Sequence, residues 1–449
     1  MEALLHAVLD TGTRGPRFGD AIFERATFTR TNDKHWSFYR VQFDGVADFN
    51  HAHFEGTGFF GEVVFNDLYL FGATFDGGVY FHQATFGERV RILGPLVCTD
   101  VVSFSWAVFE GPVEIMIVAP EVDCSRTRYD STVTLRLRYA ALDLTGARFS
   151  SSTAVQTQPS AFHVYEPVDE QAVVSACPLG IAPTVRLKSI GWVDAGHLVL
   201  TDVDVSECKF SGAFHLDQLR MEACTFGETP RSWRWTRRKV LAEEQHWRGW
   251  MSPPEEDPEY PFLQPGGPGV LAATYRQLRK SFEDTKNEPD AADFYYGEIE
   301  MRRHDRSRPW AERALLSLYW AVSGYGLRAS RAILALLFSM VLTVVLLMWV
   351  GLPAESQGPR TTGVVTAGHR IDVTTEAPGP GGATPGPQRD RFTWERAKKA
   401  GLTTINSVVF RSAGQDLTLP GTYIEMTSRV VEPVLLALAL LAVRGRVKR

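Results

Sequence analysis

Large apolar residues recur at five-residue intervals through the first part of this chain. The series begins with Phe18 and Phe23 and resumes at Phe38 and Phe43. A small apolar residue usually stands two positions earlier, as Ala21 does before Phe23. A period of five matches neither the 3.6 residues of a helical turn nor the two-residue alternation of a flat strand.

After Phe43 the phase slips by one residue, and the series continues. The residues predicted to form the repeat core in this stretch are Phe49, Phe54, Phe59, Phe65, Leu70, Phe75, Phe81 and Phe86. A five-residue period suits a coil whose sides are short extended pieces separated by turns. The large residue and the small one before it then point inward, and stacked coils bury together what one coil leaves exposed.

These residues resemble the pentapeptide-repeat family, which implies a β-solenoid in the form of a right-handed quadrilateral β-helix. The resemblance is strong over residues 18–115 and 198–227 and weak over 116–197. A four-sided coil with five residues on each side would repeat after 20 residues. In this sequence the pattern instead recurs after 16 residues, which is three five-residue repeats plus one residue, as between Phe49 and Phe65. The extra residue is either a corner bulge or the sign of an irregular coil. Residues 151–197, with four prolines, are predicted to be an insertion or an irregular coil.

The middle of the chain is predicted to be helical. A helix near 236–248 precedes an acidic, proline-rich linker at 252–268, and two helices follow at 272–286 and 290–303, with Asp290 as the predicted cap of the second. This pair is similar to a tetratricopeptide-type hairpin and to the juxtamembrane hairpin of membrane-linked pentapeptide proteins.

Residues 332–352 carry no charge, and a mostly apolar run of 21 residues is long enough to cross a bilayer. Arg328 and Arg331 precede this run and Trp349 lies near its far end, which is typical of an inner basic flank and an outer aromatic anchor. Residues 353–392 are rich in Pro, Gly and Thr and are predicted to be a disordered loop.

A second apolar run, 433–443, is short for a span and by itself suggests a core helix or a re-entrant segment. Extended back to residue 424 it is long enough, but it then contains Glu425, Arg429 and Glu432 on one helix face. Such charges either pair within the membrane or line a polar path, or else this part lies in the outer interface. The basic tail 444–449 and the arginines before the first span predict two spans in the cell membrane with both termini cytoplasmic. Six bases between 389 and 411 oppose that orientation.

Residues 402–449 resemble the pore helix and second span of two-span ion-channel modules. Residues 402–410 would form a re-entrant helix, and 411–416 would occupy the position of a selectivity filter. This stretch lacks the Thr-x-Gly-Tyr-Gly pattern of a potassium filter. The resemblance therefore favours an anchor of pore-like shape over a conducting pore.

Six segments follow from these patterns: a solenoid at 1–227 (irregular or with an insertion at 151–197), a helix and linker at 228–270, a helical hairpin at 271–310, a juxtamembrane helix and first span at 311–352, a loop at 353–392, and a re-entrant or interfacial helix with the second span and basic tail at 393–449. Charge is distributed unevenly among them. Residues 1–227 carry 28 acids and 17 bases, and the remainder carries 24 acids and 30 bases. An acidic half joined to a basic half indicates two different environments.

Few residues suggest chemistry. The five cysteines have no metal-type spacing and are interpreted as reduced, buried small side chains. His51 and His53 lack a third ligand, so no metal site is expected. The basic, aromatic stretch 231–239 suits a membrane surface better than nucleic acid. No nucleotide loop or catalytic constellation stands out, so no cofactor is expected and an enzyme is the least favoured function.

Three functions remain. The leading one is a membrane-anchored scaffold whose acidic rod binds an unknown protein partner and whose spans contact membrane lipid. The second is a channel-like or signal-transmitting membrane protein, which requires a homo-oligomer. The third, implied by the resemblance, is a DNA mimic that inhibits topoisomerases, but the charge is modest for that function and nucleic acid is not an expected partner.

Overall fold

A computed structural model describes residues 21–23, 26–27, 30–31, 35–163, 170–176, 182–230, 237–251, 266–353, 360–366, 370–376, 391–409 and 417–447. The chain divides into two compact units, Met1–Ser307 and Arg308–Arg449. The boundary between the units lies at Ser307, not at residue 227, where the sequence divides into an acidic and a basic part.

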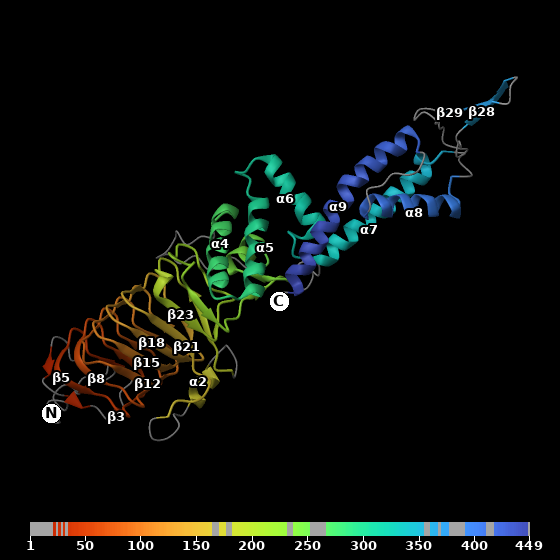
Figure 1. The fold of residues 1–449 in the computed structure, drawn as a ribbon. Helices are drawn as coiled ribbons and strands as arrows, with labels where there is room; N and C mark the ends of the chain where they lie inside the picture. The colour runs from red at the N-terminus through yellow and green to blue at the C-terminus, as the bar shows by residue number, and fades with distance from the viewer. Residues whose placement is uncertain are drawn as a thin grey trace. The chain divides into compact units, whose positions relative to one another are not determined.

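The first unit contains a β-solenoid of about eight coils (Figure 1), which confirms the predicted fold class. In the described residues its coils form three parallel sheets. The first sheet contains β4 (His35–Ser37), β7 (Thr57–Phe59), β10 (Val79–Tyr80), β13 (Val101–Ser103), β16 (Glu121–Asp123), β19 (Ala141–Asp143), β22 (Val185–Ser189) and β24 (Val203–Asp204). The second contains β1 (Ile22–Phe23), β2 (Ala26–Thr27), β5 (Gln42–Asp48), β8 (Val64–Tyr69), β11 (Thr85–Phe86), β14 (Val108–Phe109), β17 (Arg128–Tyr129) and β20 (Arg148–Phe149). The third contains β3 (Arg30–Thr31), β6 (His53–Phe54), β9 (Thr74–Phe75), β12 (Ile92–Cys98), β15 (Val113–Val118), β18 (Val133–Arg138), β21 (Thr153–Thr157), β23 (Leu198–Thr201) and β25 (Arg220–Glu222).

Each coil nevertheless has four inward-facing sides. Between residues 107 and 126 the buried pairs, each two residues apart, are Ala107 and Phe109, Val113 and Ile115, Ile117 and Ala119, and Val122 and Cys124. The long strand β15 supplies most of two of these sides, so that four sides appear as three sheets. The residues between the pairs point outward, because side chains alternate along an extended backbone.

Between residues 35 and 157, successive coils align 20 to 23 residues apart. Phe109 lies beside Tyr129, Phe65 beside Phe86, and Phe86 beside Phe109. The 16-residue recurrence is therefore not the coil length. It joins phenylalanines three sides apart, as Phe49 and Phe65 are, and the extra residues lie at corners. The hypothesis that the coil is irregular is replaced by a four-sided coil with corner insertions.

One predicted core residue is wrong. Phe59 is 42% exposed, whereas its neighbour Phe60 is fully buried. Counting five residues from Phe54 placed Phe59 inside, but the coil has one extra residue at that corner. The other predicted core phenylalanines lie in the interior: Phe49, Phe54, Phe65, Phe75, Phe81 and Phe86.

Aromatic rings stack along the solenoid axis at the spacing of the strands. One column runs from Phe43 through Phe65, Phe86 and Phe109 to Tyr129, with centroids 4.3 to 5.5 Å apart. Parallel strands lie about 4.8 Å apart, which is also a favourable distance for offset ring stacking. An aromatic residue at this position in each of these coils therefore stacks on its equivalents in the coils before and after it.

The weak repeat signal over 116–197 hides regular coils followed by an insertion. β15, β18 and β21 pair in continuous register with a 20-residue spacing. The inward residues of these three strands are Val, Ile, Leu and Thr rather than Phe, so the pattern is harder to recognise. The insertion is narrower than the predicted 151–197, because β21 and β22 are regular strands. Phe162 and Val173 of this insertion, the latter on α2 (Gln171–Ala176), pack outside the coils against Val97, Val118 and Tyr139.

Helices close the C-terminal end of the solenoid. β26 (Gly227–Glu228) pairs with β27 (Lys239–Val240), and α3 (Ala242–Trp247) follows. The predicted hairpin is α4 (Pro268–Asp284) and α5 (Glu288–His304). Phe282 and Phe294 contact Phe226 of the last coil, so the hairpin and solenoid share one core. Asn287, not Asp290, caps α5, because its side chain accepts from the Asp290 amide.

The second unit is mainly helical. It comprises α6 (Trp310–Ser323), α7 (Ala329–Leu346) continuing as the π-helical turn η2 (Leu347–Gly351), α8 (Trp394–Val409) and α9 (Leu419–Val447). Within the predicted disordered loop, β28 (Arg360–Thr366) and β29 (Arg370–Glu376) pair antiparallel, so the prediction of disorder is wrong for these residues. Their Thr- and Val-rich sequences favour strands. By length and composition, two helices in the described chain are able to cross a membrane: Ala329–Gly351 and Leu419–Val443.

Candidate functional site

The two long apolar helices meet through a buried polar contact. α7 and α9 pack along one another, and the Thr343 hydroxyl of α7 lies 2.8 Å from Glu432 Oε1 of α9. Thr343 and Glu432 are both buried, whereas large apolar residues such as Phe338 and Val430 face outward. The second oxygen of Glu432 has no hydrogen-bond partner among the described residues. Glu432, one of the three charged residues predicted to share a face of this helix, thus faces the neighbouring helix.

The other two predicted charges pair with each other one turn earlier on α9. Arg429 donates to Glu425 Oε1 over 2.8 Å, and Glu425 is buried. Spacing four residues apart on a helix brings these side chains together. The structure therefore combines Glu425 with Arg429 and places Glu432 separately against Thr343. The sequence left open whether these charges pair with each other, and in the structure two of the three do.

Replacing Thr343 with valine tests the contact between the helices. The variant keeps the shape of the side chain but removes the donor to Glu432, so we expect a loss of about 0.5–2 kcal/mol of unfolding free energy. The measurement is a titration with sodium dodecyl sulfate in mixed micelles. Thr427→Val is the matched control, because among the described residues the exposed Thr427 hydroxyl bonds only to the Tyr423 carbonyl of its own helix. Equal effects of both variants would refute a specific contact.

The start of α9 crosses the end of the first apolar helix at a pair of glycines. A Cβ on Gly421 would clash with the Gly351 carbonyl oxygen, so no larger residue fits. The Thr418 amide donates to the Gly351 oxygen over 3.0 Å, and its hydroxyl donates to the Val350 oxygen over 2.6 Å. Small residues allow such close helix crossings in membranes.

α8 packs against the end of the first apolar helix and the start of α9. Ala400 is buried beside Leu347 and Leu352. The Arg396 guanidinium donates to the carbonyl oxygens of Leu352 (2.7 Å) and Pro353 (3.0 Å), which follow the last turn of the first apolar helix. A guanidinium group at a helix C-terminus satisfies carbonyls that lack partners. Residues 411–416, predicted to stand in the filter position, lie outside the described residues.

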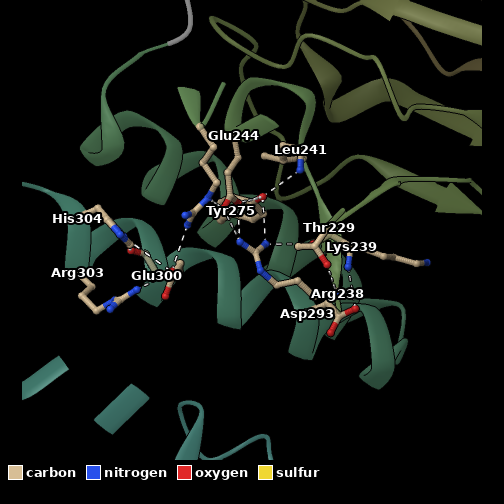
Figure 2. A network of polar contacts seen from close by, with 11 residues as sticks. Thr229, Arg238, Lys239, Leu241, Glu244, Tyr275, Asp293, Glu300, Arg303 and His304 are labelled. Atoms are coloured by element: carbon tan, nitrogen blue, oxygen red, sulfur yellow. Dashed lines mark hydrogen bonds and ion pairs between the residues drawn. The ribbon is translucent and has the colours of Figure 1, made fainter. Parts of the chain in front are cut away.

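A second polar cluster lies in the cap of the solenoid and was missed by the sequence analysis (Figure 2). Arg238 Nη2 donates to both oxygens of Glu244 over 2.6 Å, with side-chain exposures of 2% and 0%. The Tyr275 hydroxyl donates to Glu244 Oε2 over 2.5 Å and accepts from the Leu241 amide. Arg248 bridges Glu244 and Glu300, which links α3 to α5.

Electrostatics within this cluster favour the charged pair. Burial opposes ionisation of Glu244, but Arg238 and Arg248 outweigh it and hold the pKa of that carboxyl below its usual range. Burial and the neighbouring Glu244 raise the pKa of Tyr275, which remains a neutral donor. The cluster is a fully satisfied network that ties β27, α3, α4 and α5 together.

This cluster corrects one prediction. The basic stretch 231–239 was predicted to face a membrane surface, but Arg238 is buried, Arg237 pairs with Glu228, and Lys239 pairs with Asp290. Residues 231–236 lie outside the described residues. A sequence signal did exist, since Tyr275 lies on the predicted apolar face of α4 and a buried tyrosine needs a polar partner.

The remaining candidates have structural roles. Burial raises the pKa of Cys98 to about 12 and that of Cys224 to about 11, so both thiols stay protonated. Cys177 is not among the described residues. His53 lies against Thr74 and Asp76 of the next coil. In the part of the chain that is described, no group of His, Cys, Asp and Glu is arranged to hold a metal ion.

Comparison with known proteins supports the solenoid. Residues 38–85 match the family model described as pentapeptide repeats (9 copies). This segment, which lies within the β-solenoid, is thus similar to pentapeptide repeats. No curated protein and no solved structure matches the chain.

Proposed function

We propose that this chain is a membrane-anchored scaffold whose solenoid presents a surface to protein partners. The observation that carries the proposal is the inverted polarity of α7 and α9. Their outward faces hold large apolar side chains, whereas Thr343 and Glu432 lie between them. Water favours the opposite arrangement, and a lipid environment favours this one.

The outer surface of the solenoid supports a role in binding. Trp106 and Trp192 are exposed and occupy equivalent corner positions in two coils, where each adopts a positive φ. The Arg126 guanidinium lies 4.6 Å from the Trp106 ring centroid. Tryptophan and arginine are the residue types that contribute most at protein interfaces. This surface offers recognition rather than catalysis.

Fractionation of cells tests the anchoring. The full chain is expected in the membrane fraction and to resist extraction with alkaline carbonate. A chain that ends at Ser307, the boundary between the compact units, is expected in the soluble fraction with the circular dichroism of a β-rich protein. Release of the full chain by carbonate would contradict the proposal.

A second candidate is an oligomeric, channel-like or signal-transmitting protein. The position of α8 between the end of the first apolar helix and the start of α9 favours it, because a short helix in that place resembles a re-entrant segment. Light scattering in detergent and ion flux into liposomes test it. A monomer without flux would exclude this function and leave the scaffold intact.

A further inference from the structure

Helix α6 exposes its apolar side and partly buries its charged side. All exposed positions of α6 are apolar: Trp310, Ala311, Ala314, Leu315, Leu318 and Ala321. On a helical wheel they form one continuous arc of about 140°. Trp310 is 81% exposed, Leu315 65% and Leu318 61%. A helix facing water would turn this arc inward.

The charged residues of α6 lie off this arc. Glu312 and Arg313 are only half-exposed, and Arg308 donates to Glu312 over 2.5 Å. The inner side of the helix packs against α7 and α9. The apolar arc is therefore the side that remains available to something outside the unit.

The turn after α6 fixes its direction. Gly324, Tyr325 and Gly326 all have positive φ, and Tyr325 is buried against Tyr319. The Arg331 guanidinium donates to the Trp320 carbonyl and lies 5.0 Å from the Trp320 ring centroid. These contacts join α6 to α7 through a packed bend, so the two helices do not form one continuous rod.

The length of α6 and its direct connection to α7 indicate what covers the apolar arc. A 14-residue helix is about 21 Å long, which is too short for a hydrocarbon core of about 30 Å. α6 nevertheless leads directly into a helix long and apolar enough to cross one. Residues 308–331 hold four arginines and one glutamate, a composition that suits a surface of lipid headgroups.

We propose that α6 is an interfacial helix whose apolar arc lies at the boundary between headgroups and acyl chains, on the side of the bilayer where α7 begins. Trp310, Leu315 and Leu318 enter the acyl region, and the arginines contact the headgroups. This inference rests on the proposed membrane anchoring and adds a second, parallel contact with lipid. With α6 in this position, the chain enters the membrane from a helix that lies along its surface.

Site-specific fluorescence in the full chain reconstituted into liposomes tests the inference. Single cysteines replace Leu315 on the arc, Arg313 opposite it and Leu337 on the outer face of α7, and each is labelled with an environment-sensitive dye. The wild-type chain, whose described cysteines are mostly buried, is labelled in parallel for background. Quenchers are aqueous iodide and lipids with a nitroxide placed near the headgroup or deep in the acyl chain.

The expected result is a contrast between the two sides of α6. The label at 315 should be quenched most by the shallow nitroxide and several-fold less by iodide than the label at 313. Two results would overturn the inference. In the first, iodide quenches the labels at 315 and 313 equally. In the second, the label at 315 is protected from iodide but is not quenched by either nitroxide lipid, which indicates that protein and not lipid covers it. The label at 337 separates these failures from a failure of membrane anchoring. If the deep nitroxide quenches it, α7 crosses the membrane and only the inference about α6 is refuted. If the deep nitroxide does not quench it, the proposed membrane anchoring is refuted as well.

Discussion

Replacing Glu244 with glutamine is expected to remove about 3–5 kcal/mol from the unfolding free energy of the first unit. In the variant the Arg238 guanidinium is still charged and only 2% exposed, but it has lost its carboxylate partner. The glutamine also replaces one carboxylate oxygen, an acceptor, with an NH2 donor beside the guanidinium groups of Arg238 and Arg248. A buried charge that loses its partner costs far more than a surface pair, because water no longer compensates it. Urea denaturation of the purified chain followed by circular dichroism measures the loss.

The adjacent surface pair gives a matched control. Glu228 pairs with Arg237 over 2.8 Å, but its side chain is more than half exposed. Glu228→Gln should therefore cost less than about 1 kcal/mol. If both glutamines cost the same, the buried network does not hold the cap in place.

The same network predicts a dependence on pH. Glu244 has a folded-state pKa below its ordinary value of 4.5, so its contribution is present above pH 4.5 and decreases as the pH falls through the lower folded-state value. The wild-type chain should lose more stability on acidification than Glu244→Gln. Parallel pH profiles of the two proteins would contradict the assigned pairing.

Replacing Phe81 with alanine is expected to cost about 3–5 kcal/mol, which is comparable with the loss of Glu244. The buried Phe81 ring stacks between Phe60 at 5.0 Å and Phe104 at 5.2 Å, so the cavity would interrupt a column that crosses several coils. Neighbouring coils hold each other in place, so the surroundings cannot easily collapse into the cavity. The urea midpoint of the β-sheet signal measures the effect.

Phe59→Ala distinguishes the two possible phases of the repeat. Phe59 stacks on Tyr80 at the surface and does not enter the core, so its removal should cost about 1 kcal/mol or less. A cost at Phe59 similar to that at Phe81 would show that Phe59, and not Phe60, points inward.

Local rules explain why so much of the fold was predictable. A five-residue period fixes which side chains share an interior, since each coil repeats the same inward pair and needs no distant partner. The same holds for α4 and α5, whose apolar faces are visible in their own sequences. The signal failed where the inward residue is not aromatic, as at Cys124 in the coils after residue 116, because no large side chain marks the phase there.

The candidate sites depend on contacts between distant residues. Glu432 was recognised as unusual from sequence, because a charge in an apolar run is costly wherever it lies. Its partner Thr343 is 89 positions away and has no distinguishing neighbours. Arg238 was assigned to a surface because the residues before it are basic and aromatic, and only the fold brings Glu244 and Tyr275 around it.

The solenoid class, the apolar helices and the uneven charge follow from the amino-acid sequence alone, because period, length and composition are properties of short stretches. Three other features depend on three-dimensional packing: which of Phe59 and Phe60 lies inside, that the helical hairpin closes the solenoid, and that α6 turns its apolar arc outward. Each of these depends on how one segment stacks against another. A corner holds its extra residue where the adjacent coils allow it, and a helix face is buried only if the fold provides something to cover it.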